Sequence, residues 1–170
     1  MPLSVENLED QTKYRQMLAI SYNNLIPFIF DQLRQKTVLM VFFWATCILF
    51  LGFAVIIRFN ISGFFPVNKI LSHTILGAVI FPVLIIPVHE VLHIIPYFLS
   101  GARTIRIGMD LKQYLFYVTA HRYVATPGQF IIVAVIPFII ISVIFTLLII
   151  ILPGLWKWSL SLFLFAHTTM

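Results

Sequence analysis

The chain has 170 residues, of which 61% are hydrophobic and only 10% are charged. Soluble domains carry about a quarter charged residues, so this composition and a mean hydropathy of +1.01 predict an integral membrane protein with one membrane domain. The net charge of +5 then reflects membrane topology rather than nucleic-acid binding, and a single cysteine, Cys47, excludes an intrachain disulfide framework.

The N-terminal segment, 1–37, is the only long stretch of mixed polarity. A helix start at Ser4, and then the apolar LIPFIFDQL around Pro27, predict one or two short amphipathic helices on the membrane surface. A packing arm without a function of its own fits this segment equally well. We assign 1–37 as a cytoplasmic or interfacial segment and 38–170 as the membrane-embedded domain. The first apolar run begins too late for a cleavable signal peptide.

Three long apolar segments follow. Residues 38–57 contain no charge and are long enough to cross a bilayer as a helix. The second segment, about 74–100, carries three prolines, each of which removes a backbone donor and disturbs the carbonyl four residues earlier: Pro82, Pro87 and Pro96. The third segment, about 129–152, has no charge and one predicted kink, at Pro137.

A more polar stretch, 101–128, separates the second and third apolar segments. Its TIRIGM alternates in polarity and is followed by YLFYVTA, which predicts two short strands joined by a turn. A fourth apolar helix begins near Trp156 and has only about fourteen residues by Met170, fewer than the ~20 that a span needs. We therefore expect an all-α integral membrane protein with about four transmembrane helices, the last incomplete, and a short β-hairpin-like segment between helices 2 and 3. We also expect that the natural chain continues past Met170.

Lysine and arginine predict the orientation. With a cytoplasmic N-terminus, eight of them lie inside and three outside, and the positive-inside rule favours this orientation. The inside group is Lys13, Arg15, Arg34, Lys36, Arg103, Arg106, Lys112 and Arg122, and the outside group is Arg58, Lys69 and Lys157. We expect a multi-pass protein of the cell membrane, such as a bacterial inner membrane.

Three polar side chains, His89, Glu90 and His93, interrupt the second apolar segment in the sequence HEVLH. On an α-helix the two histidines lie about 40° apart around the axis and about 6 Å apart along it, so both imidazoles can bind one ion. Neutral imidazole is a good zinc ligand, and H-E-x-x-H on a helix is a zinc-binding pattern. Glu90 projects to a neighbouring position, from which it can take a proton as zinc-bound water attacks a carbonyl.

The cost of these groups at membrane depth supports a functional role. A carboxylate at mid-membrane costs about 3 kcal/mol on insertion scales, and a purely structural helix does not need one. The alternative is an inert helix–helix contact in which Glu90 pairs with Lys69 or with a histidine.

HEVLH in a proline-broken membrane helix resembles the intramembrane zinc metalloproteases of the site-2 protease type. It is more similar to a bacterial family of membrane proteins described as zincin peptidases, over about residues 75–170. In that family the H-E-x-x-H helix precedes a polar strand-like segment, an apolar helix with an internal proline (here VIPFIIIS) and a last helix. The resemblance implies an aspartate in the last helix as third metal ligand, whereas this chain has only Asp10, Asp31 and Asp110.

His167 is the remaining histidine at membrane depth. It lies about 15 Å from the outer face and His93 about 12 Å from the inner face, so the two depths together nearly fill a ~30 Å hydrocarbon layer. His167 is therefore a candidate third metal ligand, a partner of a ligand, or a neighbour of a ligand beyond Met170. His73 is expected at a membrane boundary and His121 on the surface.

The main prediction is an intramembrane zinc metalloprotease that hydrolyses peptide bonds of an unidentified membrane protein or peptide, with no nucleic-acid partner. His89 and His93, with His167 as a third candidate, hold Zn²⁺, and Glu90 activates the water. One alternative is a non-enzymatic membrane protein with a structural or vestigial metal site. Another is a haem electron-transfer protein with His93 and His167 as axial ligands, although such a site has no need of Glu90.

Overall fold

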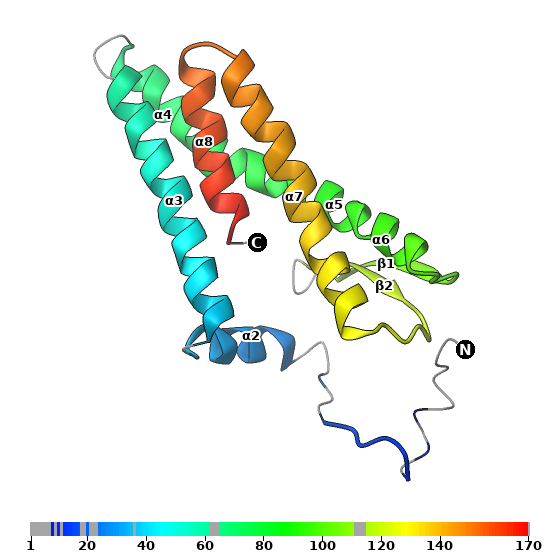
Figure 1. Ribbon diagram of the computed structural model, residues 1–170. Helices are drawn as coiled ribbons and strands as arrows, with labels where there is room; N and C mark the ends of the chain where they lie inside the picture. The colour runs from blue at the N-terminus through cyan, green and yellow to red at the C-terminus, as the bar shows by residue number, and fades with distance from the viewer. Residues whose placement is uncertain are drawn as a thin grey trace.

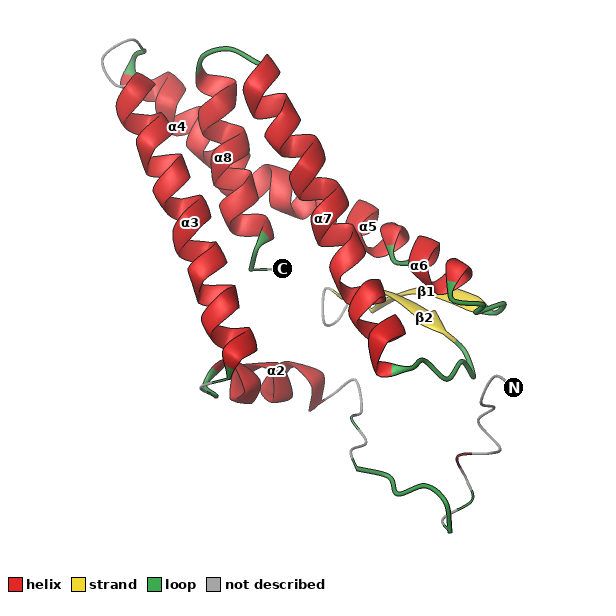
Figure 2. Ribbon diagram, in the orientation of Figure 1, coloured by secondary structure: helices red, strands yellow, loops and turns green. Residues whose placement is uncertain are grey.

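The computed structural model describes residues 8, 10, 12–17, 20, 24–35, 37–61, 65–110 and 115–169. Most of these residues are helical, and the strands form a single two-stranded sheet (Figures 1 and 2). The helix start expected at Ser4 lies outside the described residues. A short helix does follow it: α2, Leu25–Leu33, with Pro27 in its first turn, where a missing amide donor is tolerated.

Three helical segments are long and apolar enough to cross a membrane: α3 (Val38–Ile61), the continuous run Val67–Leu99, and α7 (Pro127–Ile151). They match the three predicted spans, with ends that differ by a few residues. The fourth predicted span corresponds to α8, Leu155–His167, whose 13 residues are shorter than a bilayer requires. The described part of the chain thus contains three such helices rather than four.

The segments of the second span are α4 (Val67–Ile75), the π-helical turn η2 (Leu76–Ile80), α5 (Phe81–Leu92) and α6 (Ile94–Leu99). The span is divided beside Pro82 and Pro96, whereas Pro87, also predicted to disturb the helix, lies inside the unbroken α5. Between α5 and α6, the amide of His93 donates to the Glu90 carbonyl, three residues back, at 3.1 Å. This tight turn places His93 at the end of α5.

Although it is short, α8 is the centre of the bundle. It lies between α3 and α7 (Figure 1) and also packs against α4 and η2. The buried side chains Leu160, Phe163, Leu164 and His167 all belong to it. A β-carbon on Gly77 in η2 would collide with the main chain of Ser159, so only glycine permits this close approach of η2 to α8.

The predicted hairpin is confirmed. Strands β1 (Ile105–Asp110) and β2 (Leu115–Ala120) pair antiparallel, with Ile107 opposite Val118. The hydroxyl of Tyr123 donates to the Ser100 carbonyl at 2.6 Å and so joins the segment that leaves the hairpin to the one that enters it. This bond holds the hairpin against the end of the second span, next to α5.

The hairpin and α2 lie toward the same end of the bundle, and α2 runs across the foot of α3 (Figure 1). Two apolar side chains of α2, Ile29 and Phe30, are exposed, and the membrane-surface location expected for this segment stays a prediction. The three long apolar helices support a membrane protein, as the composition predicted.

Candidate metal centre

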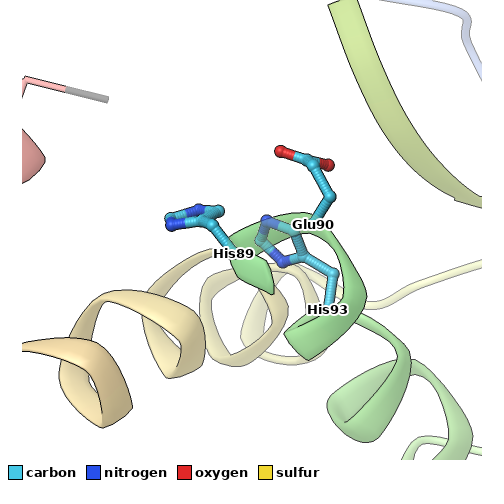
Figure 3. Close-up of side chains that lie close together, drawn as sticks. All are labelled: His89, Glu90 and His93. Atoms are coloured by element: carbon cyan, nitrogen blue, oxygen red, sulfur yellow. The ribbon is translucent and has the colours of Figure 1, made fainter. Parts of the chain in front are cut away.

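The predicted cluster of His89, Glu90 and His93 forms where α5 ends. One ligand atom from each residue lies within 4.8 Å of the others, and all three side chains are half-buried. Figure 3 shows them projecting to the same side of the helix, and the two imidazole centroids are 5.2 Å apart. The convergence expected from the helical spacing is therefore present.

A main-chain carbonyl determines which ring nitrogen of His93 carries a hydrogen. The Nδ1 atom of His93 lies 2.8 Å from the Val133 carbonyl oxygen in α7. Because a carbonyl oxygen only accepts hydrogen bonds, Nδ1 must carry the proton. In the neutral ring, Nε2 then has the free lone pair that a metal ion needs, and such an outer hydrogen bond is typical of metal-binding histidines.

His167, the last residue of α8, contacts the cluster through His89. Its Nε2 atom lies 3.2 Å from Nδ1 of His89, and its side chain is only 2% exposed. The ring stacks between Phe138 and Phe163, with centroid distances of 5.6 Å to each. His167 therefore does reach the level of the motif, as its predicted depth required. It is not a member of the group whose ligand atoms all lie within 4.8 Å, and its Nδ1 has no hydrogen-bond partner among the residues that the structure describes.

Glu90 faces the hairpin. No ion pair joins it to Lys69, and both residues lie in the described part of the chain, so the inert Glu90–Lys69 contact is absent there. Instead, the Glu90 carboxylate approaches the main-chain amide of Val118 in β2. The carboxylate is thus held near the two imidazoles and also beside a strand.

In the described part of the chain, β2, the strand beside Glu90, pairs with β1 along one edge and with no strand along the other. The amide of His121 donates to the Thr104 carbonyl at 2.8 Å, so Thr104 and His121 form a hydrogen-bonded pair of the antiparallel ladder. Hydrogen-bonded pairs alternate along such a ladder, so the next ones are Arg106 with Thr119 and Gly108 with Tyr117. The amides of Phe116, Val118 and Ala120 consequently point away from β1. The approach of the Val118 amide to Glu90 agrees with this register, and it shows that the unpaired edge of β2 runs along the site.

The remaining histidines lie elsewhere. His73 in α4 contacts the Ser159 hydroxyl through Nδ1 at 2.7 Å, which ties α4 to α8. His121 follows β2 in an exposed turn. In the part of the chain that is described, no aspartate joins a metal-binding group.

Sequence reasoning missed the groups that surround the motif. The Val133 carbonyl and the Val118 amide belong to the main chain and leave no side-chain signal. The two phenylalanine rings around His167 cannot be told from ordinary apolar residues. Only Pro137 was a usable signal, because it marks the Val133 carbonyl as one without its helical donor.

The donor set fits zinc. Imidazole nitrogens and a carboxylate are zinc donors, and the tautomer that the Val133 carbonyl imposes leaves Nε2 of His93 available. A membrane-spanning helix that presents these groups together defines a candidate metal-binding membrane protein. The chain belongs to the family described as "Putative zincin peptidase", whose model matches residues 82–170, just over half of the sequence. No curated protein and no solved structure matches the chain.

Proposed function

We propose that the protein is an intramembrane zinc metallopeptidase that hydrolyses peptide bonds in or near the bilayer. The observation that carries the proposal is the convergence of two imidazoles and a carboxylate on a helix apolar enough to span a membrane. Membership of a zincin peptidase family supports the same reaction class. Burying ionisable groups inside a membrane costs free energy, and groups found there generally mark a functional site.

Each residue has a definite role in this proposal. His89 and His93 hold the ion, and the Val133 carbonyl keeps the His93 ring in the required tautomer. Zinc, when bound, supplies Lewis acidity toward a water molecule and a peptide carbonyl. Glu90 accepts the proton that the water loses as it attacks the carbonyl carbon, and then delivers it to the amine nitrogen as the peptide C–N bond breaks.

His167 is the proposed third member of the donor set. It is buried, it touches His89, and no aspartate of the described chain lies in α8. His167 has two possible roles. It is either a direct metal ligand through its own Nε2, or a partner whose Nε2 orients His89 by a hydrogen bond to the Nδ1 atom of His89. The zinc affinity and zinc content of a His167→Ala variant separate these two roles.

The free edge of β2 supports a docking mode for the substrate. An extended peptide that pairs with this edge would bond to the amides of Phe116 and Ala120, which lie on either side of the Val118 amide that Glu90 approaches. Such pairing would bring a substrate carbonyl beside Glu90, which approaches Val118. A helical substrate has no spare main-chain groups for this pairing, so the segment to be cut must first unwind.

For the location, we propose a cell membrane with the N-terminal segment and 101–128 on the cytoplasmic side. The eight-to-three division of lysine and arginine favours this orientation. The position of α2 and the hairpin toward one end of the bundle is compatible with it.

The test combines metal analysis with detection of cleavage. Purified wild-type protein should contain one zinc per chain, and the His89→Ala, His93→Ala double variant should contain none. His121→Ala, which removes an exposed histidine away from the cluster, is the matched control and should keep its zinc. Full zinc in the double variant would refute the site.

Proteolysis is tested with Glu90→Gln, which keeps the shape of the side chain but cannot take up the proton. Membranes from cells that express wild-type protein should contain new peptide N-termini, detected by mass spectrometry, that are absent with Glu90→Gln. Zinc content should be equal in the two proteins. The same N-termini at the same abundance in both would show that Glu90 is not the base.

Two alternatives have distinct outcomes in these measurements. A non-enzymatic protein with a structural metal is favoured by the absence of an aspartate in α8, and it would bind zinc without producing cleavage. A haem protein would show a strong visible absorption band in the purified state. We expect no such band.

A further inference from the structure

Pro137 lies inside α7 and is fully buried. Proline has no amide hydrogen, so it cannot make the helical bond to the carbonyl four residues earlier. That carbonyl belongs to Val133, which is only 4% exposed. A buried carbonyl away from water needs another donor, because leaving it unpaired costs about 1–3 kcal/mol.

The donor that reaches this carbonyl is a residue of the metal-binding motif. Nδ1–H of His93 lies 2.8 Å from the Val133 oxygen, 40 residues away in sequence. The buried carbonyl thereby gains a partner, and the His93 ring gains a fixed orientation and tautomer. With an ordinary residue at position 137, the amide of that residue would occupy the same oxygen and keep it aligned with the helix axis.

We propose that Pro137 is a positioning residue of the metal centre, which keeps the Val133 carbonyl free to hold His93 with Nδ1 protonated and Nε2 available to zinc. The zinc part rests on the proposed function. The hydrogen bond and the tautomer do not, since they follow from the contact between His93 and the Val133 carbonyl alone. Pro137 acts only through Val133 and touches neither metal nor substrate in this proposal.

The test compares three residues at position 137: the native proline, alanine, and lactic acid, the α-hydroxy analogue of alanine, introduced by nonsense suppression. Pro137→Ala restores an amide donor toward Val133. The lactic acid form has the same methyl side chain but an ester oxygen in place of the N–H. Both forms lose the ring and its packing equally, so they differ only in the N–H donor and in the weaker acceptor strength of the ester carbonyl at Ile136.

Zinc affinity is measured by competition with a chromophoric chelator, on full-length protein in detergent. We expect Pro137→Ala to bind zinc about tenfold more weakly, within the 10–100-fold range for lost outer hydrogen bonds, because the carbonyl can share its second lone pair. The lactic acid form should bind as wild type does. In metal-free protein, ¹⁵N NMR of His93 should report the Nδ1–H tautomer in the native and lactic acid forms and a tautomer mixture in Pro137→Ala.

Equal zinc affinity in all three forms would overturn the proposal, and so would an equal loss in alanine and lactic acid forms, which would make the proline ring the cause. If Pro137→Ala does not fold, the lactic acid form alone still tests the proposal. The proposal is then overturned if His93 in that form lacks the Nδ1–H tautomer. If wild-type protein binds no zinc, the proposed function fails. The NMR comparison still decides whether Pro137 controls the His93 tautomer.

Discussion

The contact between Gly77 and Ser159 gives a quantitative prediction for the variant Gly77→Ala. Gly77 lies in η2 at the point where the second span meets the central helix α8. A β-carbon there would collide with the main-chain Cα, carbonyl carbon and oxygen of Ser159. Main-chain atoms cannot rotate away as a side chain would, so one of the two helices must move.

The size of the effect follows from two opposing terms. Overpacking a tight contact costs about 1–3 kcal/mol, and a collision with main-chain atoms belongs at the upper end, about 3 kcal/mol. Replacing glycine by alanine within a helix returns about 0.5–1 kcal/mol. The net loss is therefore about 2 kcal/mol in the free energy of unfolding, roughly a 30-fold fall in the ratio of folded to unfolded protein.

The assay is reversible unfolding of the purified protein in mixed micelles with increasing denaturing detergent, followed by circular dichroism. The matched control is Gly52→Ala in α3, where an added β-carbon meets nothing within 4 Å. The control should unfold at the wild-type detergent fraction or slightly above it. Gly77→Ala with the same transition as the control would show that η2 and α8 are not packed this closely.

Three further predictions concern the site and the topology. If His167 completes the donor set, His167→Ala should lower zinc occupancy as much as His93→Ala does. A loss of about 10–100-fold in affinity with occupancy retained at high zinc would assign it the orienting role, and unchanged affinity would exclude both roles. Removal of zinc with a chelator should lower unfolding stability by about 3 kcal/mol when zinc had been present at 100 times its dissociation constant, while the double histidine variant should not respond. A cysteine placed at position 112 should resist a membrane-impermeant thiol reagent added to intact cells, and labelling from outside would contradict a cytoplasmic 101–128 segment.

Much of the architecture was predictable because its causes are local. The apolar run from Val38 determines its own helix, since a bilayer requires internally satisfied backbone bonds whatever the neighbours are. The alternation in 105–110 likewise specifies the first strand of the hairpin. The H-E-x-x-H spacing brings His89 and His93 together through helical geometry alone, so that pair needed no tertiary information.

The short helix α8 shows where sequence reasoning reached its limit. Hydropathy and length identify it as an incomplete span at the edge of the described chain, yet it is the most buried helix of the bundle. Its burial depends on Gly77, which allows η2 to approach Ser159, and no pattern within α8 indicates this contact.

By itself, then, the sequence determined three helices apolar enough to span a membrane, the hairpin, and the two histidines with Glu90 between them. Each of these features arises from residues within one continuous segment or one strand pair. The tertiary structure decided which groups surround that motif. The Val133 carbonyl contacts His93, which is 40 residues away in the sequence, and His167 contacts His89, which is 78 residues away. Such contacts depend on how separate helices pack, and one helix face cannot specify the depth and rotation of another. The tautomer of His93, and with it the atom available to a metal ion, was therefore fixed only when α7 packed against α5.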